Sequence, residues 1–379
     1  MNWIALRMLV VNPGKYLSMI LGIAFASLLI SQQASIFTGL MRLTASQIRD
    51  IRGANLWVMD PNVQFIDDIK PMSENELYRV RGVPGVEWAV KLYKGLSRAR
   101  LPDGSYQQTI LIGLDDGSMV GAPQEIFKGR LADLRQPDAV IVDRAGAKQL
   151  WPEDPYRLGR TFEMNDRRAV VVGFCEASRT FQTFPIVYAR YSQAIGFVPQ
   201  ERKVMSFILA QSTGAIDPEE VCRRIEKQTG LQAETRYDFT KMTIMYYMQK
   251  TGIPINFGIT VFLGFIVGTA VVGQTFYLFT VENIRQFGTL KALGVGNLSL
   301  MGMVVLQATV VGSIGYCLGV GAASLFGYMT ESAAKLAFFM PWWILVGTGV
   351  AVMLIIILSS LFSLRRVLSV DPATVFQGG

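Results

Sequence analysis

Residues 251–281 read TGIPINFGITVFLGFIVGTAVVGQTFYLFTV and contain no Asp, Glu, Lys or Arg. A helix needs about 20 apolar residues to cross about 30 Å of hydrocarbon, so this stretch is long enough to span a membrane. Lipid cannot pair open backbone groups, and a helix is therefore the expected structure. Three further stretches share the same lack of charge: residues 16–41, 292–330 and 336–364.

The first of these stretches has a second interpretation. Residues 16–41 could belong to a cleaved signal peptide, whose apolar core is typically about 7–15 residues long. The uncharged stretch exceeds that length, and no clear small-x-small cleavage site precedes the charged region. We expect it to be retained as a membrane helix.

Charged residues are concentrated between the first and second apolar stretches. Of the 36 basic and 29 acidic residues, only ten lie outside residues 42–250. The predicted fold class is a membrane protein with four transmembrane α-helices and a large α+β extracytoplasmic domain between helices 1 and 2. The net charge of +7 is spread over both parts, so it does not indicate nucleic-acid binding.

The water-facing domain shows alternating strand and helix signals. Residues 87–100 and 106–113 predict a hairpin around the turn Leu-Pro-Asp-Gly at 101–104. Asp217 followed by Pro218 predicts a helix start, and Gly230 its end. Ser73 and Glu76 have the spacing of a capping box.

Basic residues flanking the apolar stretches predict the orientation. Because cytoplasmic loops carry an excess of Lys and Arg, the ends bearing these residues should be cytoplasmic and the large domain periplasmic. Both termini are then on the cytoplasmic side of a multi-pass inner-membrane protein. The six residues are Arg7, Lys15, Arg285, Lys291, Arg365 and Arg366.

These signals divide the chain into eight segments. They are an N-terminal amphipathic helix with transmembrane helix 1 (1–41), the periplasmic α+β domain with helical stalks (42–250), transmembrane helix 2 (251–281), a cytoplasmic helix (282–297), transmembrane helix 3 (298–330), a short external loop (331–341), transmembrane helix 4 (342–364) and a cytoplasmic tail (365–379).

Residues for common catalytic chemistry are scarce. The chain has no histidine, and Cys175, Cys222 and Cys317 lack metal-site spacing. Cys317 is expected in the core of helix 3, while pairing of Cys175 with Cys222 stays open. The sequence indicates no partner group for the adjacent carboxylates at 67–68 and 115–116, and they are expected to be solvated. No G-x-x-x-x-G-K-[ST] loop occurs, so we predict no enzyme, no bound cofactor and no metal.

Residues 282–297 carry the most specific pattern. Ile284, Phe287, Leu290 and Leu293 recur every three residues and predict a short amphipathic helix that ends at Gly294. Such a helix could dock into a groove on a partner or lie at the lipid headgroups. Periodicity alone does not separate these two interpretations.

The string GTLKALG at 288–294, preceded by Glu282 and Arg285, resembles the motif of the MacB/FtsX-like (type VII) permease family of ABC transporters. Residues 3–9 (WIALRML) are similar to its N-terminal amphipathic helix. The Arg-rich exit at 364–366 and the Asp-Pro-Ala at 371–373 are similar to its tail. Within the family, the chain resembles most the stand-alone permeases of the heterocyst glycolipid exporter type.

The resemblance implies that the helix over 282–293 is a coupling helix seated on a separate ATPase, which binds ATP and Mg. It also implies a second permease copy, with a homodimer expected, and in some relatives a periplasmic adaptor and an outer-membrane channel. The expected function is the permease subunit of an ATP-driven exporter working by mechanotransmission. The alternative is an FtsX-like permease that regulates a cell-wall hydrolase or other periplasmic partner. The implied ATPase-contact residues are Glu282, Ile284, Arg285, Phe287, Gly288, Leu290, Lys291 and Leu293.

Small residues suggest where helices pack. Gly264 and Gly268, like Gly315 and Gly319, have the spacing that lets helix backbones approach closely, within one chain or across a dimer. Many family members carry Glu where this chain has Gln307, so no charge-based role is assigned there. An Asp at Phe287 or Leu290 should abolish ATPase association if these side chains form the contact. The sequence does not specify the cargo.

Overall fold

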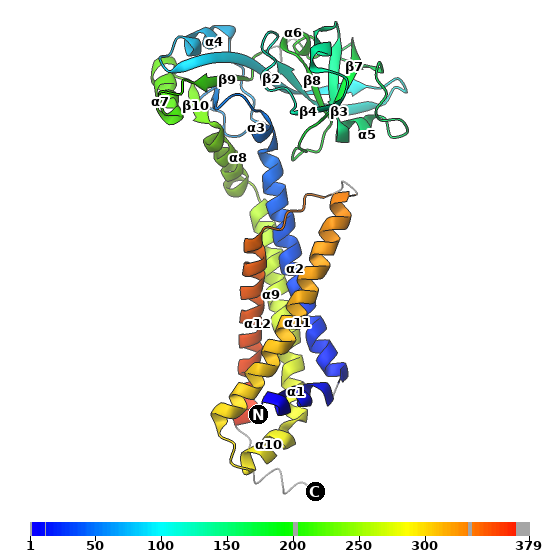
Figure 1. The fold of residues 1–379 in the computed structure, drawn as a ribbon, viewed down its shortest axis with the longest axis vertical. Helices are drawn as coiled ribbons and strands as arrows, with labels where there is room; N and C mark the ends of the chain where they lie inside the picture. The colour runs from blue at the N-terminus through cyan, green and yellow to red at the C-terminus, as the bar shows by residue number, and fades with distance from the viewer. Residues whose placement is uncertain (1, 12, 200–203, 333–335, 369–379) are drawn as a thin grey trace. The chain divides into compact units, whose positions relative to one another are not determined.

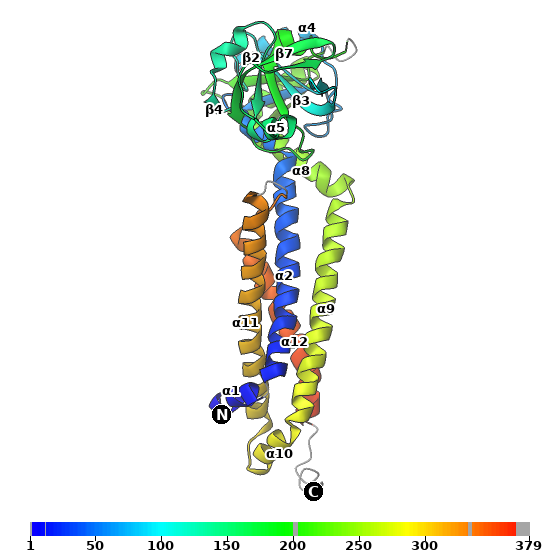
Figure 2. The ribbon, with the colours of Figure 1, turned by 90° about the vertical axis from the view of Figure 1, so that its right-hand side faces the viewer.

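The computed structural model describes residues 2–11, 13–199, 204–332 and 336–368. The chain divides into two compact units, each of which is treated by itself (Figures 1 and 2). The membrane unit consists of Met1–Leu40 with Gly252–Gly379, and the outer unit is Met41–Thr251. The Asp-Pro-Ala motif at 371–373 lies outside the described residues.

The described residues of the membrane unit include four long apolar helices. These helices run side by side (Figures 1 and 2). At about 1.5 Å per residue, each is long enough to cross about 30 Å of hydrocarbon. Two short helices, α1 (Asn2–Val11) and α10 (Ile284–Ala292), lie near one end of this bundle. The long helices are α2 (Pro13–Thr44), α9 (Ile253–Glu282), α11 (Asn297–Ser332) and α12 (Trp342–Leu368).

The core of the membrane unit is an apolar cluster shared by these helices. Ile23 of α2, Phe276 of α9, Val304 of α11 and Ile355 of α12 are all buried in it. Side chains on the outer faces of α9 and α12 stay exposed and apolar, as expected for surfaces that contact lipid. The fold class predicted from the sequence is therefore confirmed for this unit.

The outer unit is a mixed α/β domain. Its helical and 3₁₀ elements are α3 (Ser46–Asp50), α4 (Glu74–Arg81), η1 (Leu131–Arg135), α5 (Arg144–Leu150), α6 (Tyr191–Ala194), α7 (Pro218–Thr229) and α8 (Arg236–Lys250). Its strands are β1 (Leu56–Met59), β2 (Val86–Arg100), β3 (Tyr106–Leu114), β4 (Glu125–Lys128), β5 (Ala139–Asp143), β6 (Thr161–Met164), β7 (Arg167–Glu176), β8 (Ile186–Arg190), β9 (Phe207–Ser212) and β10 (Gln232–Thr235).

The strands form one sheet in the order β10-β1-β9-β2-β3-β8-β5-β7-β4, with β6 paired to β2 and β7. The pairs β3–β8 and β5–β7 are parallel and the others antiparallel. The long strand β2 joins two halves of the sheet, because its first part pairs with β9 and its second part with β3 (Figure 1).

Strand β1 shows how the sheet separates two cores. Side chains alternate between faces along a strand, so Leu56 and Val58 pack toward α4 and α7, whereas Trp57 and Met59 enter the second core. In that second core the Trp57 ring contacts Phe239 of α8, with centroids 5.3 Å apart. Both faces of β1 are thus buried.

The predicted ends of α7 are confirmed, whereas the predicted capping box at the start of α4 is not. Asp217 caps α7 by accepting a bond from the Glu219 amide (3.2 Å), and Gly230 ends the helix with a φ of 73°. The capping box predicted at Ser73 is wrong: Ser73 makes no side-chain cap bond, and the Glu76 carboxylate accepts from Arg79 instead (2.7 Å). The Glu76 carboxylate accepts from the Arg79 guanidinium in place of the Ser73 backbone amide that a capping box requires.

The cysteines also differ from expectation. Cys317 is exposed on α11, because Gly315 and Gly319 occupy the packed face of that helix and Cys317 points away from it. Cys175 and Cys222 are buried free thiols in different apolar clusters. Burial raises the pKa of Cys222 to about 12, which keeps it protonated.

Candidate functional site

The junction between α9 and α10 is a single buried residue, Asn283. Its side-chain amide donates to the Phe279 carbonyl (2.8 Å), which belongs to the last turn of α9. Its own carbonyl accepts bonds from the amides of Gln286 (3.0 Å) and Phe287 (3.1 Å), which begin α10. Asn283 therefore ends α9 and begins α10. Because the same residue bonds to both helices, α10 has little freedom to move separately from α9.

Phe287 anchors α10 to the membrane unit. Its side chain is 1% exposed and belongs to the same apolar cluster as Phe276 and Phe279 of α9. Leu290 packs against this cluster, and Ile284 is half-buried. Phe287 and Leu290 of the predicted apolar stripe thus face the protein itself.

The end of α10 is a Schellman motif. Gly294 has a φ of 89°, which glycine adopts without the penalty that a Cβ would impose. The Gly294 amide donates to the Lys291 carbonyl (3.1 Å) and the Val295 amide to the Leu290 carbonyl (3.1 Å). Val295 and Leu290 both pack on the apolar cluster, which is the contact that usually accompanies this motif.

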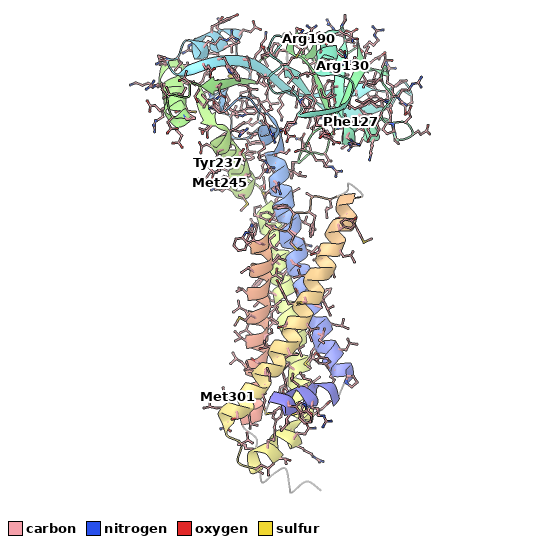
Figure 3. The ribbon with its side chains drawn as sticks, viewed as in Figure 1. Phe127, Arg130, Arg190, Tyr237, Met245 and Met301 are labelled. Carbon is pink, nitrogen blue, oxygen red and sulfur yellow. The ribbon has the colours of Figure 1, made fainter. Side chains whose placement is uncertain are left out.

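Two leucines protrude at the turn that follows. Leu293 is 77% exposed and Leu298, in the first turn of α11, is 83% exposed. Both flank Gly294 and Gly296, and the Ser299 amide bonds to the Gly296 carbonyl (3.0 Å), so the turn is tight. Figure 3 shows the side chain of Met301 one turn further along α11. This pair of exposed leucines, with α10, is the candidate contact surface.

The N-terminal helix α1 is fixed to α11 by Gln307. Ala5, Met8 and Leu9 are buried in the membrane-unit core, and the fully buried Gln307 side chain donates to the Ala5 carbonyl (2.7 Å). On the other side of α1, Trp3 is exposed and stacks under Arg7. An aromatic ring beside a cation is typical of a helix at the headgroup level.

We expect Gln307→Leu to destabilise the membrane unit by about 1 kcal/mol, because the buried hydrogen bond from Gln307 of α11 to the Ala5 carbonyl of α1 would be lost. Thermal unfolding in detergent and hydrogen exchange over residues 2–11 measure this. Gln274→Leu is the matched control, since Gln274 is exposed on α9. Equal effects of the two substitutions would contradict the anchoring role.

The end of α9 is also tied to the start of α2. Lys15 forms an ion pair with Glu282, the first of the predicted contact residues. Arg285 lies exposed on α10, whereas Gly288 is buried and Lys291 is half-buried. Glu282, Arg285 and Leu293 are therefore accessible on this segment, while Phe287 and Gly288 are not.

The predicted packing glycines lie against α2 of the same chain. A Cβ at Gly315 would be 2.7 Å from Ile23 Cβ, and one at Gly319 would be 2.7 Å from Ser27 Cβ. Gly264 lies against Leu29, and Gly268 against Ala26 of the same helix. Both pairs of glycines are thus used for packing inside one chain.

Sequence reasoning missed Asn283, Leu298 and the Lys15–Glu282 pair. An Asn between two helical patterns is a recognised cap signal and could have been noticed. Leu298 falls after the glycine that ends the stripe, so no periodicity indicates it. In the described part of the chain, no group of three or more Cys, Asp or Glu side chains could hold a metal ion.

Comparison with known families gives two matches that together cover most of the chain. Residues 17–228 match the model of the MacB-like periplasmic core domain. Residues 258–372, which include α10, match the model of the FtsX-like permease C-terminal region.

Individual relatives agree with these matches. An uncharacterized ABC transporter permease of Mycobacterium tuberculosis is 24% identical over 350 residues, covering 90% of this chain and 91% of the relative. One from Mycobacterium bovis is 33% identical over 113 residues, covering 30% of this chain and 31% of the relative.

Two solved structures are similar to the outer unit. The periplasmic region of MacB from Actinobacillus actinomycetemcomitans has 16% identity and a TM-score of 0.37, covering 52% of this chain and 95% of that one. The extracellular domain of YknZ, a noncanonic ABC-type transporter from Gram-positive bacteria, has 16% identity and a TM-score of 0.36, covering 48% and 98%.

Proposed function

Because this chain belongs to the MacB/FtsX-type family of ABC transporter permeases, we propose that α10 and the following turn receive force from a separate ATPase and pass it along α9 to the outer unit. The observation that carries the proposal is the rigid seating of α10 beside an exposed apolar pair. Asn283 and Phe287 hold the helix to α9, while Leu293 and Leu298 extend outward.

The exposed surface suits a protein groove. Leu293 and Leu298 supply apolar anchors, and Arg285 with Gln286 and Thr289 supplies a polar rim. Interfaces of this kind have an apolar centre surrounded by polar groups. To transmit force, α10 must not bend relative to α9. The buried, hydrogen-bonded junction at Asn283 meets that requirement.

We place the α10 end of the membrane unit in the cytoplasm. The elements that carry Arg7, Lys15, Arg285 and Lys291 meet at this end (Figures 1 and 2), and a cytoplasmic excess of basic residues follows the positive-inside rule. The protein is then an inner-membrane permease with a periplasmic outer unit. ATP and Mg bind to the partner, and a second permease copy completes the assembly.

Replacing Leu293 or Leu298 by Asp should reduce co-purifying ATPase activity at least about tenfold, because an apolar anchor would become charged. The intact chain is purified from its native membranes, and ATP hydrolysis per permease is measured. The matched control is Tyr237→Asp on α8, where Tyr237 is 75% exposed in the outer unit (Figure 3). Undiminished ATPase association in both leucine variants would rule out this contact.

Because Phe287 is buried, loss of ATPase association in Phe287→Asp no longer tests the contact, as the sequence had suggested it would. An Asp at Phe287 would place a charge in the membrane-unit core and disturb folding. Loss of association in that variant would not identify a contact surface.

We propose export over regulation of a periplasmic hydrolase, since residues 17–228, which include most of the outer unit, match the MacB-like periplasmic core domain. Periplasmic adaptor and outer-membrane channel partners are part of this proposal. Reconstituted vesicles containing permease and ATPase should accumulate cargo on ATP addition. Activation of a cell-wall hydrolase without any transport would favour the regulatory alternative.

A further inference from the structure

The outer unit contains a hollow of about 310 Å³ beside the middle of β2. This volume is at the lower end of the range for small-ligand sites, about 300–1,000 Å³. Ile110 is buried in its wall, and Leu96 is half-buried there. Its apolar walls are formed by Ile69, Pro71, Leu96, Ile110 and Val204.

A buried ammonium group lies in this wall. The Lys94 side chain is 5% exposed and pairs with the Asp67 carboxylate. Its Nζ also donates to the Ile66 carbonyl (3.3 Å). An ammonium has three donors, and these two acceptors are its partners among the described residues. One N–H of the ammonium therefore has no acceptor among the described residues.

Gln182 supplies the complementary group. Gln182 lines the same hollow, and its side-chain oxygen is buried and has no hydrogen-bond partner among the described residues. Buried polar atoms in folded proteins are nearly always paired, so this oxygen is suited to accept a bond from a ligand. The hollow thus offers one donor and one acceptor between apolar walls.

The site is preformed. The Ser206 hydroxyl donates to the Lys94 carbonyl (2.8 Å) and accepts from the Lys94 amide (3.0 Å), which fixes the strand at the ammonium. The loop that carries Asp67 is held by Phe65, whose ring stacks on Tyr246 of α8 with centroids 4.1 Å apart. A preformed site spares the ligand the cost of ordering it.

We propose that this hollow binds a short apolar peptide segment. A peptide bond carries one carbonyl for the Lys94 ammonium and one N–H for the Gln182 oxygen, and aliphatic side chains fill the walls formed by Leu96 and Ile110. The volume accommodates about two such residues. Lys94 and Asp67 neutralise each other, so the site selects an uncharged amide over a free carboxylate.

The test uses the intact chain in lipid nanodiscs and N-acetyl-leucyl-leucinamide as the probe. Calorimetry, with empty nanodiscs subtracted, should give a dissociation constant on the order of 0.1–1 mM. Leu96→Trp fills the hollow and should weaken binding more than about tenfold. Gln182→Ala should weaken it about three- to tenfold.

The matched control is Gln193→Ala. Its side-chain oxygen is likewise buried without a partner among the described residues, but Gln193 does not line the hollow, so binding should be unchanged. Hydrogen exchange of β2 verifies that each variant is folded. No saturable binding, or equal binding in the Gln182 variant, would overturn the proposal. Octanoate binding without peptide binding would overturn the choice of an amide ligand.

Discussion

Replacing Gly319 by valine is expected to destabilise the membrane unit by about 3 kcal/mol, because α11 and α2 touch at this point through their backbones. A Cβ at Gly319 would be 2.8 Å from the Leu28 nitrogen and 2.7 Å from Ser27 Cβ, and closer still to the Ala24 carbonyl oxygen. Backbone atoms of a helix cannot relieve a clash by a rotamer change, as a side chain can. The two helices would have to separate along the whole contact.

Thermal unfolding of the chain in detergent measures this effect, and Gly319→Ala should give a smaller loss in the same direction. Gly321→Val on the same helix is the matched control, since no atom lies within 4 Å of a Cβ there. We expect the control to change stability by less than about 0.5 kcal/mol. Similar losses in both valine variants would show that the contact with α2 is not the cause.

Asp143→Asn is expected to destabilise the outer unit by about 2–3 kcal/mol. The buried Asp143 carboxylate accepts bonds from the Gly146 amide (3.0 Å) and the Ile186 amide (2.7 Å) through its two oxygens. It thereby caps α5 and holds the start of β8. An asparagine amide would turn an N–H₂ group toward one of these donors and leave that donor buried without an acceptor.

The same residue predicts a pH dependence. Burial raises the pKa of Asp143 to about 6, above an unfolded value of about 3.9. The native state therefore binds more protons between these values, and stability falls by about 3 kcal/mol as pH rises from about 4 to about 6. Above about pH 7 this contribution is constant. Asp143→Asn should lack it, so the stability gap between the two proteins should be wider at pH 4.5 than at pH 7.5.

Hydrogen exchange of β5, α5 and β8 in the intact chain, corrected for the intrinsic pH effect, reports these changes. Asp103→Asn is a control, because the contribution of Asp103 to stability changes with pH in the opposite direction. Bonds from Ser105 lower the pKa of Asp103, so its contribution is present above the unfolded pKa and lost as pH falls. A pH slope that survives in Asp143→Asn would assign the dependence to another group.

The sequence alone determined the four spans and the position of α10. Hydrocarbon accepts only long uncharged helices, so each apolar stretch identifies its own structure without reference to the rest of the chain. The end of α10 at Gly294 is equally local, because a left-handed residue closes a helix with bonds to its own last turn. The hairpin of β2 and β3 follows from its turn residues in the same way.

Which side chains of these elements are buried and which are exposed was decided only by the tertiary structure. Ile284, Phe287, Leu290 and Leu293 form one stripe in the sequence, yet Phe287 is buried and Leu293 is exposed. Burial depends on what packs against each residue, and the cluster that covers Phe287 comes from helices distant in the sequence.

The same reason applies to the other contacts between distant segments. Gly319 lies against α2, nearly 300 residues earlier in the chain, and Lys94 pairs with Asp67 across a loop. Spacing within a helix or strand indicates which residues share a face, but carries no information about the segment opposite. Only the folded chain brings the two together.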